Sequence, residues 1–259
     1  MTDLEKLVKL NEILISEKPQ YSSRAADFPK DIQSQWRLFR SLVNIREAKP
    51  IDRTFLDLQD SLLKKMIADK GITSMDSLTP VQENIYLWQG DITTLQVDGI
   101  VNAANSGLTG CYYPCHGCID NAIHTFAGVQ LRLACDSIMK EQGYPEPTGK
   151  AKITKAYNLP SKYILHTVGP IITGNLSQED CGQLASCYQS CLELAEKQNL
   201  KSIAFCCIST GEFRFPNNKA AEIAVKTVSE YLSIHPEMSV VFNVFSDEDY
   251  RIYNRILNC

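Results

Sequence analysis

Residues 99–107 read Gly-Ile-Val-Asn-Ala-Ala-Asn-Ser-Gly, a short apolar run that ends in small and polar residues. The β-branched start predicts a strand over Gly99–Ala103, because apolar runs of this length bounded by turn residues suit strands better than helices. The small residues that follow leave room for a ligand at the end of the strand. Asn105 offers both a donor and an acceptor there, as a sugar diol requires, although Asn-Ser-Gly also forms plain turns.

Strand-like runs of this kind alternate with helical stretches from about residue 83 onward. The other expected strands are Asn84–Trp88, Lys152–Tyr157, Tyr163–Thr167, Ser202–Ile208 and Ser239–Phe245. The expected helices are Ile119–Gln142, Asp180–Lys197, Asn218–Ser233 and Asp247–Leu257. This alternation predicts an α/β fold with a largely parallel sheet and helices on both faces. Ligands of such sheets bind beyond the carboxyl ends of the strands, so a site is expected in the loops that follow strands.

The first part of the chain has a different pattern and is expected to form a helical extension over residues 1–75. Leucines recur there at helical spacing, as at Leu7, Leu10 and Leu14. We find no ligand-bearing motif in this part. We therefore expect the helices to pack on a second domain, residues 83–259, that carries the chemistry.

The composition of the 259 residues argues against several classes of function. Hydrophobic residues make up 44% and the net charge is −4, with lysine and arginine scattered, so we expect no nucleic-acid partner. No apolar run approaches the roughly 20 residues of a membrane helix, and the start lacks the layout of a signal peptide. We expect a cytoplasmic protein with no membrane partner. Its ten cysteines are expected to form no disulfide framework and mostly to fill the core.

A cluster of soft ligands stands out from the other cysteines: residues 111–118 read Cys-Tyr-Tyr-Pro-Cys-His-Gly-Cys. Three thiols and one imidazole within eight residues predict a zinc site rather than a magnesium or calcium site. The helix expected to follow should lower the pKa of thiols at its N-terminus, which favours the thiolates that zinc requires. A loop with incidental cysteines is the alternative.

The segment from Pro114 to Cys118 also matches the Pro-Cys-x-x-Cys half of a zinc nucleoside deaminase. Such a deaminase needs a His-x-Glu element upstream of that half. The chain has this pattern only at residues 235–237, far downstream and across a proline. The deaminase interpretation therefore fails.

Two further strand ends carry polar residues. Residues 90–92 read Gly-Asp-Ile, and Asp91 either caps the next turn or accepts a hydrogen bond from an exocyclic amine. Residues 208–213 read Ile-Ser-Thr-Gly-Glu-Phe, and their backbone N–H groups suit phosphate oxygens. No lysine of the P-loop type accompanies them, so ATP hydrolysis is not expected.

Four motifs of the second part, taken together, resemble the macrodomain family. They stand in the order and spacing of that family: Gly90-Asp91-Ile92, Val101-Asn102-Ala103-Ala104-Asn105, Ile119-Asp120-Asn121-Ala122-Ile123-His124 and Ile208-Ser209-Thr210-Gly211. The resemblance spans residues 83–259. It implies a mixed sheet between helices that binds ADP-ribose.

The resemblance also implies roles in ADP-ribose binding. Asp91 would hold the adenine amine, the backbone N–H of Ile92 would donate beside it, and Asn105 would meet the distal ribose. Phe245, at the end of the last expected strand, would stack on adenine, although a core position fits it almost as well. The residues implied to wrap the diphosphate are Ser209, Thr210, Gly211, Glu212 and Phe213.

A zinc-containing branch of microbial macrodomains matches the cysteine cluster better, because it carries Cys-x4-His-x-Cys at this place. The pattern implies Cys111, His116 and Cys118 as the metal ligands, with Cys115 as a competitor for the same metal. Three protein ligands leave a fourth tetrahedral position open, as in catalytic zinc sites.

The resemblance to hydrolytic macrodomains further implies a carboxylate close to the diphosphate and the distal ribose. Asp120 falls at that place, with Cys118 and Ile119 beside it in the ADP-ribose site. Charge compensation at a helix N-terminus is the alternative role of Asp120. His124 shares a helical face with Asp120 and is expected to be a packed, hydrogen-bonded histidine rather than a catalyst.

The function implied is that of a protein mono-ADP-ribosyl hydrolase, a zinc-dependent glycosidase that cleaves the bond between ribose C1″ and a side-chain oxygen. Asn105 is expected to position the sugar, and Asp120 to orient a water or act as a base. By resemblance, the substrate is an ADP-ribosylated protein, such as a lipoyl-carrier protein modified by a sirtuin-like transferase. The alternatives are a reader module with a structural zinc and an O-acetyl-ADP-ribose deacetylase, because the fold alone does not decide.

Overall fold

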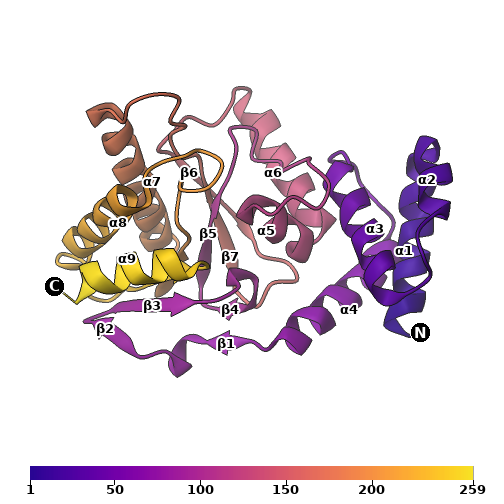
Figure 1. Cartoon of the computed structure of the whole chain (residues 1–259), viewed down its shortest axis with the longest axis horizontal. Coiled ribbons are helices and arrows are strands. Elements are labelled where there is room, and N and C mark those ends of the chain that lie inside the picture. The colour runs from indigo at the N-terminus through magenta and orange to yellow at the C-terminus, as the bar shows by residue number, and fades with distance from the viewer. Residues whose placement is uncertain (259) are drawn as a thin grey trace.

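A seven-stranded mixed sheet forms the centre of the molecule, in the strand order β2-β3-β9-β8-β5-β7-β6 (Figure 1). The computed structural model describes residues 1–258, so the expected domain end at Cys259 lies outside the described residues. The strands are β2 (Pro80–Gln82), β3 (Ile85–Gln89), β5 (Gly99–Ala103), β6 (Ala151–Lys155), β7 (Tyr163–Thr167), β8 (Ser202–Phe205) and β9 (Ser239–Val244). The inner strands run parallel, whereas β2 and β6 are antiparallel to their neighbours. The predicted fold class is confirmed.

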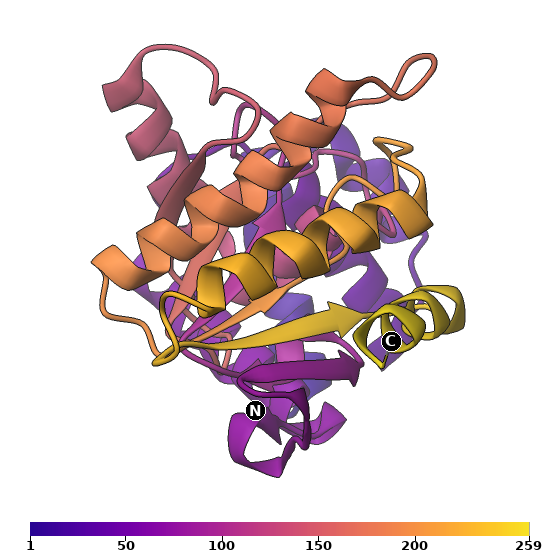
Figure 2. The ribbon, with the colours of Figure 1, turned by 90° about the vertical axis from the view of Figure 1, so that its left-hand side faces the viewer.

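Helices cover both faces of this sheet. α7 (Gln178–Lys197), α8 (Asn217–Leu232) and α9 (Asp247–Leu257) pack on one face, which Figure 2 shows from the front. α5 (Ile119–Ala127) and α6 (Val129–Gln142) pack on the other face (Figure 1). The sheet is therefore buried between two helical layers, which explains why its inner strands read as continuous apolar runs.

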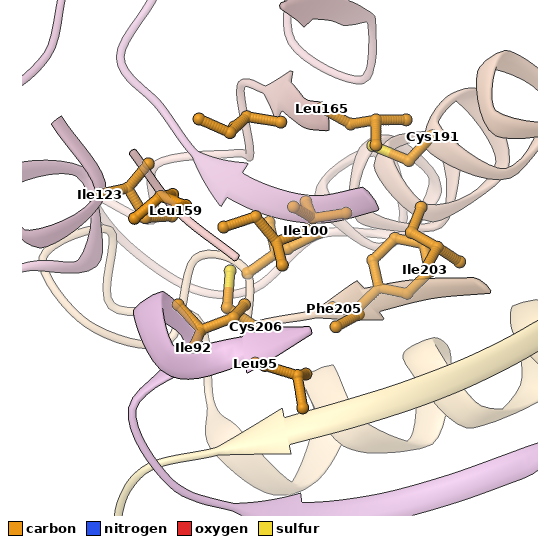
Figure 3. Packing of buried hydrophobic residues seen from close by; sticks show 14 of the residues in the cluster. Ile92, Leu95, Ile100, Ile123, Leu159, Leu165, Cys191, Ile203, Phe205 and Cys206 are labelled. Carbon is orange, nitrogen blue, oxygen red and sulfur yellow. The ribbon is translucent and has the colours of Figure 1, made fainter. Parts of the chain in front are cut away.

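The core lies between the sheet and its helices, where apolar side chains from both interdigitate (Figure 3). Ile100, Leu165 and Ile203 are fully buried on neighbouring strands. The thiols of Cys191 and Cys206 lie among them. Such thiols behave as small apolar groups, so the expected core-filling role is confirmed for these cysteines.

The expected single helix over Ile119–Gln142 is wrong, because the chain breaks it at Gly128 into α5 and α6. Gly128 has a φ of 99°, a backbone conformation that residues with a Cβ rarely adopt. Gln59 from the N-terminal helices enters at this point and accepts a hydrogen bond from Val129 N at 3.0 Å. Because a distant side chain supplies the cap, the apolar periodicity of residues 119–142 gives no sign of the break.

The N-terminal extension is helical, as predicted. It consists of α1 (Asp3–Glu17), α2 (Ser22–Ala26), α3 (Ile32–Ile45) and α4 (Arg53–Lys70), with a 3-10 turn at Pro19–Tyr21. Leu7, Leu10 and Leu14 form its buried stripe. Figure 1 shows these helices outside α5, with α3 and α4 closest to it.

The segment between α4 and β3 is bonded to the sheet domain rather than free. β1 (Thr73–Ser74) pairs in parallel with β4 (Leu95–Gln96), and β2 adds an edge strand to β3. Two 3-10 turns, Met75–Ser77 and Ile92–Thr94, lie next to these short strands. None of β1, β2 and β4 was predicted from the sequence, because strands of two or three residues show no periodicity.

Within residues 1–258, no helix has the length and apolar character that would let it cross a membrane.

Candidate functional site

The loops that were expected to carry chemistry meet at the carboxyl ends of the parallel strands. Gly90, after β3, donates its N–H to the carbonyl of Val244 at the end of β9, at 3.0 Å. The amide of Asn243 donates to the carbonyl of Gly90, also at 3.0 Å. These bonds place the adenine loop predicted at residues 90–92 beside the end of β9.

Asp91 caps the turn Ile92–Thr94, as the simpler interpretation predicts. Its Oδ1 accepts from the N–H of Thr93 at 3.0 Å and from the Thr93 hydroxyl at 2.6 Å. Its Oδ2 lies 2.8 Å from Nζ of Lys70, the last residue of α4. Burial raises the pKa of Asp91, but the hydrogen bonds from Lys70 and Thr93 outweigh it, so the pKa lies below its ordinary value. The carboxylate is therefore held charged and fixed, while about a third of it stays exposed.

Phe245 follows β9 directly and is 80% exposed, so the core position considered for it is wrong. Gln89, at the end of β3, donates to the Phe245 carbonyl at 3.3 Å, so the backbone of Phe245 lies beside the start of the loop that contains Asp91. An exposed aromatic ring at a strand end is suited to stack on a base. Ile92, the neighbour of Asp91, has a buried side chain, which leaves only its backbone for a ligand.

The structure brings Asn105 and Asp120 together, although they come from different elements. The Asn105 amide donates to Asp120 Oδ2 at 3.4 Å and to the carbonyl of Gly110 at 3.0 Å. Its Oδ1 accepts from Gly107 N at 2.9 Å, so the whole amide is oriented. Asn102 donates to the other oxygen of Asp120 at 2.8 Å. The exposed Asn105 therefore rests on a buried carboxylate.

Asp120 itself is only 5% exposed, a depth that the sequence did not indicate. Burial raises its pKa to about 6, against the opposing effects of Asn102 and Arg132. His124 Nε2 lies 3.5 Å from Asp120 Oδ1. His124 is packed as expected, but among residues 1–258 neither ring nitrogen has a hydrogen-bond partner, so the hydrogen-bonded half of that prediction is wrong.

The loop at residues 209–213 follows β8 and has the shape of an anion-binding turn. Ser209 has a φ of 66°, and its hydroxyl is buried without a partner among the described residues. Thr210 bonds back to the carbonyl of Cys207 at 3.0 Å. In the described chain, the N–H groups of Gly211, Glu212 and Phe213 donate to no protein acceptor. N–H groups in a loop that are not used by protein acceptors are available to phosphate oxygens.

The predicted metal ligands gather in space. One ligand atom from each of Cys111, His116 and Cys118 lies within 4.8 Å of the others, and all three residues are partly buried. Cys118 is also the N-cap of α5, where its thiol accepts from Asn121 N at 3.4 Å. The group therefore lies directly beside Asp120 and, through Gly110, beside Asn105. It has the spacing and donor types of a site that can hold a metal ion.

Cys115 lies in the same loop but points elsewhere. It has a φ of 54°, and its thiol lies 3.2 Å from the hydroxyl of Ser41 in α3. Asn44 of α3 accepts from the Cys115 N–H at 2.9 Å. The geometry thus favours the three-ligand set over a set that includes Cys115.

The expected lowering of the thiol pKa at the start of α5 is wrong for Cys118. Burial raises its pKa to about 12, which the N–H of Asn121 opposes and the neighbouring Cys111 and Asp120 reinforce. The N–H at the helix start is therefore too weak alone to produce a thiolate. A bound divalent cation reverses this balance, because coordination deprotonates a thiol outright.

The N-terminal helices hold the metal loop, a role that the sequence analysis missed. Arg40 donates to the carbonyl of His116 at 2.8 Å and twice to Oδ1 of Asn121, at 2.8 and 3.1 Å. From the other side, buried Arg132 donates to carbonyls of both Thr109 and Val43. The one sign of this role in the sequence was a polar residue, such as Asn44, on the otherwise apolar face of α3. Helical periodicity identifies which face of a helix is buried but not which segment packs against it.

A separate cavity of about 440 Å³ lies elsewhere, between β6, α7 and the end of α6. Lys150, Lys152 and Lys197 line it together with Glu146. Its lining includes none of the predicted site residues, so the candidate site is defined by the strand-end loops.

The chain resembles known proteins along its whole length. A family model described as Macro domain matches residues 101–224. A protein-ADP-ribose hydrolase of Treponema medium is 54% identical over 263 residues, covering 100% of each chain. Another, from Staphylococcus aureus strain MRSA252, is 50% identical and covers 89% of this chain and 87% of that one. The solved structure of a Trypanosoma brucei macrodomain in complex with ADP-ribose is 30% identical, with a TM-score of 0.66 over 84% of this chain and 94% of that one.

This chain therefore belongs to the macrodomain family, as the four sequence motifs predict. Relatives that match it over most or all of their length are named as hydrolases, and the expected enzyme class, a hydrolase, is confirmed.

Proposed function

We propose that this enzyme removes mono-ADP-ribose from modified protein side chains with the help of a zinc ion held by Cys111, His116 and Cys118. The names of its full-length relatives support the substrate class. One observation carries the proposal beyond them: the three metal-binding groups gather directly beside the contact between Asn105 and Asp120. The potential metal ligands and the fixed carboxamide of Asn105 thus lie next to each other, where the resemblance implies the distal ribose.

The donor set fits zinc. Two thiols and one imidazole are soft and borderline ligands, which favour zinc over magnesium and calcium. Three ligands from the protein leave one tetrahedral position for a water or a substrate oxygen. When bound, zinc would polarise a ribose hydroxyl or lower the pKa of a water.

The proposed reaction is hydrolysis of an O-glycosidic bond. The bond between C1″ of the distal ribose and the side-chain oxygen breaks, and a water oxygen forms the new bond to C1″. The water supplies the proton that the leaving side-chain oxygen takes up. The products are free ADP-ribose and the unmodified protein, so the enzyme reverses ADP-ribosylation.

The residues of the chain divide the tasks of binding and orientation. Asp91 and the backbone of Ile92 hold adenine with Phe245 stacked on it, and residues 209–213 bind the diphosphate. Asn105 meets the ribose hydroxyls. Asp120 accepts a hydrogen bond from the amide of Asn105 and orients the attacking water or acts as its base. The resemblance to the zinc-containing branch suggests a lipoyl-carrier protein modified by a sirtuin-like transferase as the natural substrate.

A single turnover experiment tests the proposal. A mono-ADP-ribosylated carrier protein is incubated with the enzyme, with the chelator-treated enzyme and with the chelated enzyme after zinc is restored. We expect mass spectrometry to show loss of the ADP-ribosyl mass in the first and third samples only. A label that survives excess zinc-loaded enzyme on this carrier and on a panel of other acceptor linkages would contradict the hydrolase proposal.

The same samples separate the alternatives. A reader module would bind ADP-ribose tightly, leave every linkage intact and ignore the chelator. An O-acetyl-ADP-ribose deacetylase would release acetate from that nucleotide while it leaves the modified protein unchanged. The metal group beside Asn105 favours the hydrolase over the reader, since a metal with an open position is not needed for binding alone.

A further inference from the structure

The loop with the predicted metal ligands (residues 111–118, the metal loop) is in contact with the loop expected to bind the diphosphate (residues 209–213, the diphosphate loop). Nε2 of His116 lies 3.3 Å from Oε1 of Glu212, although the two residues come from opposite sides of the site. His116 lies in the loop before α5, and Glu212 lies in the loop after β8. The Glu212 side chain is 70% exposed, so no packing of its own holds it there.

The two ring nitrogens of His116 have different surroundings. Nδ1 is buried and has no hydrogen-bond partner among residues 1–258, whereas Nε2 faces Glu212. A histidine that binds a metal through one nitrogen almost always donates the N–H of the other to a carboxylate, carbonyl or water. Nδ1 is thus the nitrogen left for a metal shared with Cys111 and Cys118, and Glu212 is the carboxylate that completes the arrangement.

We propose that Glu212 is the outer partner of the metal-bound His116 and that this contact latches the diphosphate loop to the metal loop. Zinc and ADP-ribose would then each strengthen the binding of the other. This inference rests on the proposed function, because it takes both the zinc site and the diphosphate loop from it.

The physical basis is the change that a cation makes to His116. An exposed contact between a histidine and a glutamate contributes little by itself. A metal on Nδ1 draws charge from the ring, fixes the ring plane and makes Nε2–H a stronger donor. Glu212 is then held, and with it the adjacent N–H groups of Gly211 and Phe213. A loop ordered in advance binds a diphosphate with a smaller loss of conformational freedom.

The coupling has a thermodynamic signature. If zinc raises the affinity for ADP-ribose by some factor, ADP-ribose must raise the affinity for zinc by the same factor. Both affinities are measurable without any turnover. Zinc affinity is read by competition with a chromophoric chelator, and ADP-ribose affinity by calorimetry on the zinc-loaded and the metal-free protein.

Three variants make the experiment specific. Glu212→Ala should lower zinc affinity by roughly 10- to 100-fold, as is usual for partners behind a metal ligand, and should remove the effect of zinc on ADP-ribose affinity. Glu212→Gln keeps an oxygen acceptor on a side chain of the same length. It should retain part of the zinc affinity and part of the effect of zinc on ADP-ribose affinity. Glu222→Ala is the matched control, because Glu222 also makes an exposed contact with a cationic side chain, that of Lys219, and lies in α8 outside the groups of potential metal ligands among the described residues. It should behave as the wild type.

The outcomes distinguish this inference from the proposed function. Wild-type protein that binds no zinc or no ADP-ribose contradicts the proposed function itself. Equal zinc affinity for the wild type and Glu212→Ala overturns the latch and leaves the proposed function standing. An equal loss of ADP-ribose affinity with and without zinc would also overturn it, because Glu212 would then act on the nucleotide directly. Loss of one protein ligand from the bound zinc in Glu212→Ala, measured by X-ray absorption, would make Glu212 a direct ligand and overturn the latch.

Discussion

Lys70 and Asp91 form an ion pair of 2.8 Å that joins the last residue of α4 to the loop expected to bind adenine. The pair takes Oδ2 of Asp91, while Thr93 takes Oδ1. The N-terminal helices thus help to orient a carboxylate of the candidate ADP-ribose site. A nucleobase amine that reaches this carboxylate meets an acceptor whose direction is already set.

Asp91→Ala should weaken ADP-ribose binding by roughly 1–3 kcal/mol, the usual loss for a hydrogen bond to a charged group. Calorimetry at constant salt measures the change. Asp98→Ala is the matched control, because Asp98 also pairs with a lysine and accepts backbone N–H groups, but at the amino ends of β5 and β8, the opposite end of these strands from the site loops. It should cost stability but leave ADP-ribose affinity unchanged. Equal affinities for the wild type and Asp91→Ala would remove Asp91 from the site.

Phe245→Ala should weaken ADP-ribose binding through the loss of stacking, which is worth about 1–3 kcal/mol per base. The melting temperature should stay the same, because a side chain that is 80% exposed buries little surface in the folded protein. Phe245→Tyr keeps an aromatic face and should bind as the wild type does. A variant that melts earlier but binds normally would show that the ring is structural.

Asp120→Ala should cut the turnover rate by roughly 10²–10⁴, the range for a positioned acid–base group, while ADP-ribose affinity changes far less. Asp120→Asn keeps an acceptor for the amide of Asn102 and tests whether orientation alone is enough. Activity near that of the wild type in Asp120→Asn would assign Asp120 a positioning role through Asn105. Unchanged activity in Asp120→Ala would exclude any role in the reaction.

Arg40→Ala should lower zinc affinity by about 5- to 150-fold, which corresponds to roughly 1–3 kcal/mol for a lost charged hydrogen bond. The reason is that Arg40 holds both the carbonyl of His116 and the side chain of Asn121. Arg37→Ala, on the exposed side of the same helix, is the control. Wild-type zinc affinity in both variants would show that the metal loop keeps its shape without the contacts of Arg40.

Stability should fall in acid because of His166, which is fully buried with its pKa lowered by burial to about 3. The unfolded chain takes up this proton near pH 6.5, but the folded chain does not until about pH 3. The stability is therefore complete above pH 6.5 and declines as the pH falls from 6.5 towards 3, by on the order of 1.4 kcal/mol per pH unit.

Urea unfolding of the chelator-treated protein between pH 7.5 and 4.5 measures this decline without interference from zinc binding. His166→Gln should flatten the slope, whatever it does to stability at pH 7.5. His235→Gln, at a surface histidine, should keep the wild-type slope. An unaltered slope in His166→Gln would mean that other groups cause the acid sensitivity.

The central strands were predictable because their signal is local. Gly99–Ala103 and Tyr163–Thr167 were predicted with the bounds that the structure has, since each is a buried β-branched run between turn residues. The break at Gly128 was not, because the side chain that caps α6 there comes from Gln59. Local patterns record burial and turns, whereas a cap from a distant segment leaves no trace in the periodicity.

The residue types of the candidate site could be predicted from the sequence, but the contacts from other segments that hold these residues in place could not. The spacing of the cysteine cluster was sufficient to predict a zinc site within residues 111–118, because ligands in one short loop need no tertiary information. The choice of Cys111, His116 and Cys118 over Cys115 came from the resemblance to the zinc-containing branch. The contacts from Arg40 and Lys70 come from helices that read as plain amphipathic segments. The depth of Asp120 was missed for a related reason, since its burial depends on how α5 packs on the sheet.

The packing of the metal loop against α3 has a consequence for the order in which the parts of the protein fold. The hydrogen bonds that hold residues 115–121 to the N-terminal helices span from 71 to 81 residues of sequence. Helices α1 to α4 leave the ribosome first and can form from local contacts, whereas these longer closures form late. If the site binds zinc as proposed, we expect it to do so near the end of folding. A truncated or nicked chain, in which the two parts cannot dock, should then be recognisable by a lower zinc content.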